Sequence, residues 1–229
     1  MMGAGWMRAW LAAGAACALA TGAAAQEQPR TWHAETLSSS PQGVHVTQYW
    51  SKGVDKLRAE TVIAGHRLIT LVNGNLYFAV DATAGQAVAI KRSKRALAED
   101  RTRSRLLGLE GFVIKARGGE KVTSEPLAGR MCDVWRLTDA RGRREVWVQQ
   151  EPAKEMLPLR VEIYNRQAGA EIRTDYIQWA SGLELPDRLF LPDPAFPITN
   201  LEYDDYVKRS NAGEALVPVL HANLLHGDK

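Results

Sequence analysis

The sequence has very little cysteine, which excludes a small scaffold held together by disulfides. Only Cys17 and Cys132 occur among the 229 residues. Cys17 lies in an apolar start that we expect to be cleaved, and the single remaining thiol cannot form an internal disulfide. Cys132 lies in the strand pattern "GRMCDVWRL" with no histidine nearby, which predicts a buried, unreactive side chain rather than a nucleophile.

Long apolar runs are absent after residue 25, so no later segment predicts a transmembrane helix of about 20 residues. The start has Arg8, the run "AWLAAGAACALA" and then Ala23-Ala24-Ala25, the pattern of a secretory signal peptide. We therefore expect residues 1–25 to be removed, leaving about 204 residues as a soluble periplasmic chain. Lipid anchoring at Cys17 is the alternative, but Gly14 occupies the place of the bulky aliphatic residue it requires.

The chain also lacks a large net charge and the common catalytic motifs. Without Arg8 the chain has 28 basic and 26 acidic residues, a net charge of +2 that gives no indication of nucleic-acid binding. It has no G-x-S-x-G, H-E-x-x-H, Walker loop, C-x-x-C or G-x-G-x-x-G. Apart from His221 and His226 in the tail, no histidine has a second His or Cys at metal-ligand spacing. We therefore predict no catalytic residues, no metal and no cofactor, and an enzyme with an unrecognised site is a third hypothesis after two binding functions.

Alternating apolar and polar residues dominate the rest of the chain. Short segments of this kind, joined by turn residues, predict an antiparallel sheet. The segments are 44–50, 56–64, 66–72, 75–81, 129–137, 144–149, 157–165 and 171–179. The fold class predicted is α+β, mostly β.

Two hairpins are predicted in detail. A type I′ turn at Asn73-Gly74 would place Leu71 opposite Leu76 and Ile69 opposite Phe78 on one buried face, with the Thr70/Tyr77 and His66/Asp81 pairs on the other face. A loop at 139–143 would place Trp135 opposite Trp147.

Both faces of the sheet have apolar side chains, so we expect one to be core and the other to be covered by a helix or a ligand. Helices are predicted at 93–113 and 199–209, and weakly at 214–227, where Pro218 interrupts the pattern. Residues 91–105 contain seven Lys or Arg. This basic stretch is interpreted as a solvated helix face or, alternatively, as a patch for anionic lipid or an acidic partner.

The chain after residue 25 has five tryptophans, and most of its aromatic residues fall within predicted strands. They indicate either an ordinary sandwich core or a curved sheet with an apolar pocket on its concave face. These two interpretations remain open from the residues alone.

The order of these segments resembles the LolA-like superfamily, which contains periplasmic lipoprotein carriers, their outer-membrane receptors and related sensor domains. The resemblance covers most of residues 44–194. It rests on Gly-x-x-Cys-x-Val-Trp at 129–135, on Val-Trp-Val at 146–148 followed by Leu-Pro-Leu-Arg at 157–160, and on Phe-Leu-Pro at 190–192.

This resemblance implies a strongly bent antiparallel sheet that forms an incomplete barrel, with helices covering the concave face and a cavity for acyl chains. The domains expected are a signal peptide at 1–25, an extended segment at 26–43, the half-barrel at 44–209 and a tail at 210–229. The apolar, ligand-binding face is predicted from eight residues: Trp50, Leu57, Ile63, Ile69, Leu71, Phe78, Trp135 and Trp147.

Two binding functions follow as expectations. The first is a monomeric periplasmic carrier of a lipid or acylated lipoprotein in outer-membrane lipoprotein sorting, without catalysis. The alternative is an envelope-stress sensor or regulatory domain of the same fold that binds a protein partner, at the inner or outer membrane. On the first hypothesis, Ile69→Asp should abolish lipid retention.

Overall fold

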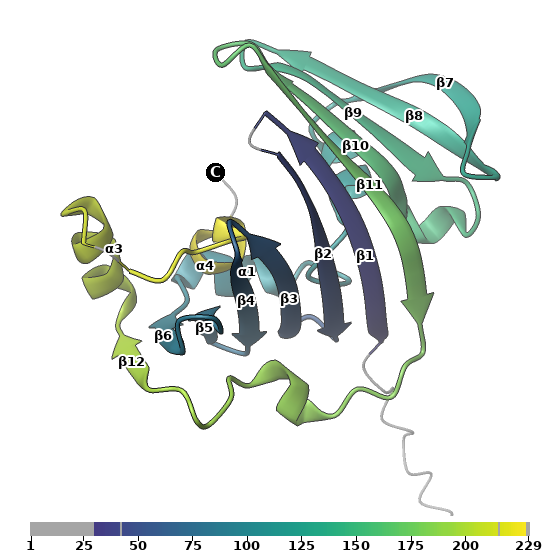
Figure 1. The fold of residues 1–229 in the computed structure, drawn as a ribbon. Helices are drawn as coiled ribbons and strands as arrows, with labels where there is room; N and C mark the ends of the chain where they lie inside the picture. Colours follow the sequence, from purple (N-terminus) through teal and green to yellow (C-terminus); the bar gives the residue numbers. More distant parts are fainter. Residues whose placement is uncertain (1–29, 42, 215, 228–229) are drawn as a thin grey trace, which may run out of the picture.

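The computed structural model describes residues 30–41, 43–214 and 216–227. The expected signal peptide, Cys17 and its cleavage site lie outside these residues. Twelve strands form one sheet in the order β12-β6-β5-β4-β3-β2-β1-β11-β10-β9-β8-β7 (Figure 1). The strands are β1 Thr31–Ser40, β2 Gly43–Lys52, β3 Lys56–Ile63, β4 His66–Asn73, β5 Leu76–Asp81, β6 Gln86–Lys91, β7 Glu120–Leu127, β8 Arg130–Asp139, β9 Gly142–Gln149, β10 Pro158–Asn165, β11 Ala170–Ser181 and β12 Ile198–Leu201.

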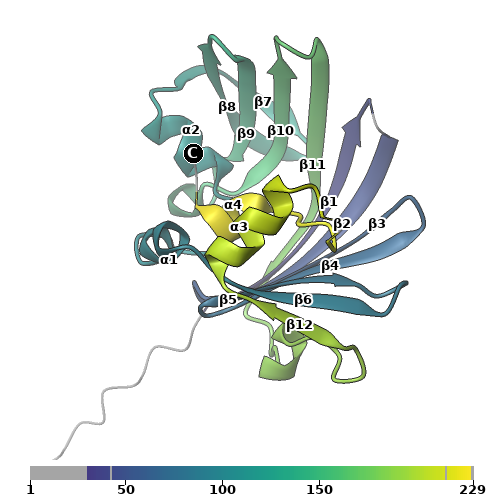
Figure 2. The same cartoon turned by 90° about the vertical axis from the view of Figure 1, so that its left-hand side faces the viewer.

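The sheet bends strongly without closing, which confirms the predicted incomplete barrel (Figure 2). Most neighbours are antiparallel because short turns join them, whereas β12 pairs with β6 in parallel and makes the sheet mixed at that edge. The described helices lie inside the curve: α1 Lys94–Asp100, α2 Glu110–Ala116, α3 Tyr203–Asn211 and α4 Ala222–His226.

Apolar side chains are buried on both faces of the sheet, as predicted. On the concave face, Leu57, Val72 and Tyr77 pack in one cluster with residues of the loop after α1 and of α4. On the convex face, Ile69, Leu71 and Phe78 form a separate cluster. The segment between β11 and β12, with the 3₁₀ turn η2 at Asp187–Phe190, runs over this convex side and contacts β3 and β4.

The β4–β5 hairpin has the predicted faces but a different pairing. Leu71 lies opposite Phe78 rather than Leu76. The two turn residues are Gly74 and Asn75, and Gly74 has a φ of +59°. Glycine at the first central position is the preference of a type II′ turn. Because the register moves by two residues, each side chain keeps its face.

The predicted Trp135–Trp147 pair is wrong. Trp147 lies opposite Val134, and Trp135 opposite Val146. This one-residue shift places the two indoles on opposite faces of the sheet, since side chains alternate along a strand. Trp135 packs with the concave cluster around Val146, and Trp147 packs with Val134 on the convex side.

A short loop causes this shift. Only Ala140 and Arg141 separate β8 from β9, and Asp139 Oδ1 accepts hydrogen bonds from the backbone N–H groups of Arg141 and Gly142 at 2.8 and 3.2 Å. A Cβ atom on Gly142 would lie 1.9 Å from the carbonyl oxygen of Tyr164. The glycine therefore permits close approach to the end of β10, and the hairpin closes earlier than predicted.

The predicted helix at 93–113 is two short helices. Ser93 caps α1, with its hydroxyl accepting from the N–H of Ala96 at 3.0 Å, and α1 ends at Asp100. An irregular loop follows until α2 begins at Glu110. Gly108 in this loop has a φ of +61°, which a continuous helix excludes.

The remaining segment predictions are refined in three places. Residues 31–40, expected as part of an extended segment, form β1, which lies between β2 and β11 in the sheet. The helix expected at 199–209 is β12 followed by α3 at Tyr203–Asn211. The expected tail contributes α4, whose Leu224 and Leu225 are buried in the concave core.

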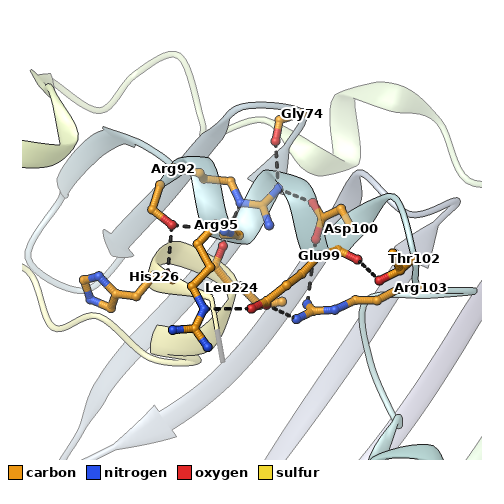
Figure 3. Close-up of polar contacts among 11 residues, drawn as sticks. Gly74, Arg92, Arg95, Glu99, Asp100, Thr102, Arg103, Leu224 and His226 are labelled. Atoms are coloured by element: carbon orange, nitrogen blue, oxygen red, sulfur yellow. Dashed lines mark hydrogen bonds and ion pairs between the residues drawn. The ribbon is translucent and has the colours of Figure 1, made fainter. Parts of the chain in front are cut away.

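The basic stretch at 91–105 forms an internal network rather than only a solvated helix face (Figure 3). Arg92 Nη1 lies 2.5 Å from Asp100 Oδ2, and Arg92 Nε donates to the carbonyl of Leu224 at 2.7 Å. Arg103 pairs with Glu99 at 2.6 Å. These contacts join α1 to α4 and hold the chain's last described segment against the concave face.

Candidate functional site

A cavity of about 420 Å³ lies between the concave face and the segments that cover it. Its volume is within the roughly 300–1,000 Å³ typical of ligand pockets. Strands β1, β2, β3, β9, β10 and β11 supply one wall, and the loop after α1, α2 and the α4 segment supply the other. The lining is apolar over much of its area, through Tyr49, Leu57, Leu106, Leu107, Leu109, Val113, Val161, Ile163, Tyr176 and Leu224.

Arg105 holds the loop that forms one wall of the cavity. Its side chain is fully buried, and its guanidinium donates to the carbonyls of Leu107, Gly108 and Glu155 at 2.9, 2.6 and 2.9 Å. Because all three acceptors are backbone atoms, the guanidinium fixes the course of the loop. The apolar side chains beside it therefore face the sheet in one arrangement.

Three aromatic rings surround the Arg105 guanidinium. Its Cζ lies 5.5 Å from the ring centre of Trp32, 5.6 Å from that of Phe112 and 5.8 Å from that of Trp179. Cation–π contacts of this kind partly replace the hydration that burial removes. The charge thus ties the loop and α2 to the sheet.

Gly108 allows the loop to approach the sheet closely. A Cβ atom there would lie 2.3 Å from Cη2 of Trp179. The Trp179 ring is itself stacked on Tyr176, with ring centres 5.1 Å apart, and its Nε1 donates to the carbonyl of Pro158 at 2.9 Å. The indole is therefore fixed on three sides beside the cavity.

The segment before α4 closes another side of the cavity. The carbonyl of Leu220 accepts a hydrogen bond from the Tyr77 hydroxyl, and His221 follows with a φ of +54°. The His221 ring packs edge-on against Tyr49 with ring centres 5.4 Å apart. Burial lowers the pKa of His221 to about 4, so the imidazole is neutral at physiological pH.

Glu110 is an acidic group on the apolar wall. Its carboxylate accepts a hydrogen bond from the Tyr176 hydroxyl at 3.2 Å. Burial raises the pKa of Glu110 above its ordinary value, while its own backbone N–H, Tyr176, Arg105 and Arg144 oppose that shift. Burial also raises the pKa of Tyr176, with a further contribution from Glu110. The pair therefore favours the protonated forms.

We expect Glu110→Gln to change how stability depends on pH. A carboxyl whose pKa is raised by folding stabilises the protein at acidic pH, and this contribution is lost as pH rises through the folded-state pKa. Glutamine does not titrate, so the variant does not lose stability in this way. The free energy of unfolding of Glu110→Gln, relative to that of wild type, should therefore increase from pH 4 to pH 8. Urea unfolding at both pH values measures the difference, and an unchanged difference would contradict the assignment.

The structure does not bring the eight predicted site residues together. Leu57 lines the cavity, Trp135 packs on the concave face under α2, and Ile63 lies at the exposed end of β3. The other five lie on the convex side, either by their cluster or by register: Trp50, Ile69, Leu71, Phe78 and Trp147. Ile69 and Leu71 line a second cavity of about 460 Å³, between the convex cluster and the segment before β12. Ile69→Asp therefore probes the convex side rather than the concave cavity.

Several lining residues were missed by the sequence analysis. Leu106, Leu107 and Leu109 were assigned to a helix, although they lie in the loop fixed by Arg105. Val161 and Ile163 alternate in β10 as predicted, but alternation does not indicate which face is concave. The deviation of "RSRLLGLEG" from a helical pattern, at its two glycines, was the available signal for the loop.

Other kinds of site find little support in the described residues. There, no group of three or more His, Cys, Asp and Glu side chains could hold a metal ion. Cys132 is buried, and burial raises the pKa of its thiol, which opposes nucleophilic reactivity. None of the helices in the described ranges has the length and apolar character that spanning a membrane requires.

Comparisons with known proteins bear on the fold. No protein-family model and no curated protein matches the chain. An uncharacterized conserved protein from Thermus thermophilus is similar in structure, with a TM-score of 0.52 and 10% identity over 74% of this chain and 90% of that one. At this identity the likeness concerns the fold alone.

Two further solved structures share less of the fold with this chain. The MucA/MucB complex of Pseudomonas aeruginosa has a TM-score of 0.47 and 14% identity over 74% of this chain and 58% of that one. An outer membrane lipoprotein-sorting protein domain from Vibrio parahaemolyticus has a TM-score of 0.33 and 12% identity over 71% of this chain and 89% of that one. The open, bent sheet with helices on its concave face is the fold that the resemblance to the LolA-like superfamily implied.

Proposed function

We propose that this chain is a periplasmic binding protein that holds an acyl chain of a lipid or acylated lipoprotein in the concave cavity, without catalysis. The observation that carries the proposal is the cavity of about 420 Å³ between the sheet and the segments that cover it, about half of whose lining is apolar. A carrier in outer-membrane lipoprotein sorting, acting as a monomer between membrane-bound partners, is the specific function this supports.

Binding by desolvation fits this lining. Each methylene group transferred from water contributes about 0.8 kcal/mol, before the costs of ordering the chain are subtracted. The two tyrosines of the wall stay neutral, since burial raises the pKa of Tyr49 to about 12 and that of Tyr176 well above its usual range. With His221 also neutral, this part of the wall imposes no charge on an apolar ligand.

Filling the cavity tests the proposal. Val113 on α2 lines the cavity and is only partly buried, so Val113→Trp should occupy the ligand's space while leaving the sheet intact. We expect the variant to lose at least about tenfold in affinity for a fluorescent acyl probe, because roughly two or more methylene groups lose their place.

The matched control is Val122→Trp, which adds the same ring at a 42% exposed position on the edge strand β7. This variant should bind the probe as wild type does. Circular dichroism and thermal unfolding establish that both variants fold. Equal affinity in folded Val113→Trp would contradict the proposed site.

A second candidate is a sensor or regulatory domain that binds a protein partner. Exposed aliphatic side chains at the ends of two adjacent strands favour it: Val44 and Val46 are 66% and 43% exposed on β2, and Val62 is 60% exposed on β3. Apolar groups gathered on a surface are typical of interaction sites. Co-purification of one defined protein, lost on Val62→Asp, together with no lipid in the preparation, would favour this candidate over the carrier.

A further inference from the structure

The cavity is apolar along much of its wall but cationic where β9 and α2 meet it. Arg144 on β9 and Arg117, which ends α2, both line it. We propose that the occupant is a single acyl chain ending in a carboxylate, and that Arg144 binds this anionic group. The inference rests on the proposed function and narrows its ligand to a free fatty acid, because an acyl chain linked to a lipoprotein as an ester or amide has no carboxylate.

Strand register places Arg144 at the end of an apolar column on the concave face. It lies opposite Ile163, and one step along the same face Val146 lies opposite Val161. Val161 in turn lies opposite Thr174 on β11. Arg144 therefore lies next to the apolar lining, with its side chain half-buried. An acyl chain along this lining would bring a terminal carboxylate to the guanidinium.

Arg144 differs from its neighbour Arg143 in forming no ion pair with a described carboxylate. Within the described part of the chain, no carboxylate oxygen lies within 4.0 Å of its guanidinium. Arg143, one residue away on the opposite face, has Glu145 at 3.7 Å and Glu171 at 4.0 Å. A half-buried guanidinium gains most from a carboxylate, which it binds with two parallel hydrogen bonds.

The other charged groups along the wall form no ion pair with Arg144 among the described residues. Arg103 also lines the cavity but lies 2.6 Å from Glu99 and 3.7 Å from Asp100. Glu110 is the acidic residue of the lining. Its carboxyl group accepts a hydrogen bond from the Tyr176 hydroxyl at 3.2 Å, and not from Arg144. Burial raises the pKa of Glu110 and favours its neutral form. A carboxylate on the ligand would therefore supply the negative charge that the wall lacks beside Arg144.

The volume favours one chain rather than several. At about 30 Å³ for each group the size of a water molecule, roughly fourteen such groups fill 420 Å³. This corresponds to one medium-length acyl chain. Twelve-carbon amphiphiles with different headgroups therefore separate the contribution of the chain from that of the charge.

Binding of dodecanoate, dodecan-1-ol and dodecyltrimethylammonium to the full-length exported protein tests the inference, at pH 7.5, low salt and concentrations below micelle formation. We expect wild type to bind dodecanoate at least tenfold more tightly than the alcohol, and the ammonium compound most weakly. Arg144→Gln should bring dodecanoate to within about threefold of the alcohol. Arg144→Lys should keep part of the preference, because it keeps the charge without the bidentate geometry.

Arg143→Gln is the matched control, since it removes the same charge from the adjacent position on the other face. It should leave the preference for dodecanoate unchanged, and an equal loss in both Gln variants would overturn the inference. Equal binding of dodecanoate and the alcohol to wild type would also overturn it, while the apolar cavity would stand. If none of the three probes binds folded wild type, the proposed function itself fails.

Discussion

Arg105→Ala should lower the free energy of unfolding by about 3–5 kcal/mol, an effect as large as breaking a buried ion pair. The substitution removes the donor from two buried carbonyls and one partly buried carbonyl, and it opens space among three aromatic rings. Burial lowers the pKa of Arg105, whereas the negative charge of Glu155 opposes that shift and favours the charged guanidinium. The loop that carries Leu106 and Leu107 should then lose its fixed course.

Urea unfolding measures this change, and Arg101→Ala is its control. Arg101 belongs to the same basic stretch but is exposed, so its replacement should alter stability by less than about 0.5 kcal/mol. A loss below about 1 kcal/mol in Arg105→Ala would show that the loop is held by its apolar contacts alone. In the expected case, the variant also binds acyl probes weakly when folded, because the loop is a wall of the cavity.

Arg92→Ala should have a comparable effect, about 3–5 kcal/mol, concentrated on the last described segment. The Arg92 side chain is fully buried and donates to Leu224 at 2.7 Å, to Gly74 at 2.9 Å and to Asp100 at 2.5 Å (Figure 3). Its removal leaves the Asp100 carboxylate buried without this partner. Hydrogen exchange should then become faster across residues 220–226 than across the strands of the sheet.

Arg95→Ala is the control for Arg92, because Arg95 is 59% exposed and pairs with Glu99 on the helix surface at 3.1 Å. Exposed pairs of this kind contribute at most about 1 kcal/mol. Equal exchange at residues 220–226 in wild type and Arg92→Ala would contradict an anchoring role for Arg92. It would also mean that the contacts of Leu224 and Leu225 suffice to hold α4.

The fold was largely predictable because strand alternation is a local signal. Ile69, Leu71 and Phe78 share one face, as the sequence predicted, even though the turn residues are Gly74 and Asn75. Trp135 shows the limit of this reasoning. Its pairing depends on the length of the loop after β8, and a difference of one residue there placed Trp147 on the opposite face.

The candidate site was harder to predict, because its walls come from segments far apart in the sequence. Leu57, Leu106, Val161 and Leu224 meet only when the sheet bends and α4 returns to its concave face. Alternation identified an apolar face around Ile69 but could not tell whether helices or the coil before β12 would cover it. The large apolar side chains of that face were therefore assigned to the same site as Leu57, although they lie on the convex side beside the segment that precedes β12.

The basic stretch was predicted only in part, since Lys91, Lys94, Arg95 and Arg101 are exposed whereas two of its arginines are buried. In the sequence, Arg92 and Arg105 cannot be distinguished from solvated arginines. Both are nevertheless buried and donate hydrogen bonds to backbone carbonyls. Such acceptors leave no pattern in the sequence, because every residue has a carbonyl. The loop that Arg105 holds includes Gly108, whose positive φ interrupts the predicted helix.

Photo-crosslinking tests the central claim most directly, since it locates the ligand on the chain. A fatty acid with a diazirine in its tail is bound to the wild-type protein, irradiated, and the labelled peptides are identified by mass spectrometry. We expect label on residues 106–113, 158–163 and 220–226, which border the cavity, and loss of that label in Val113→Trp. Label confined to residues 66–81 and 188–196, on the convex side, would contradict the concave site.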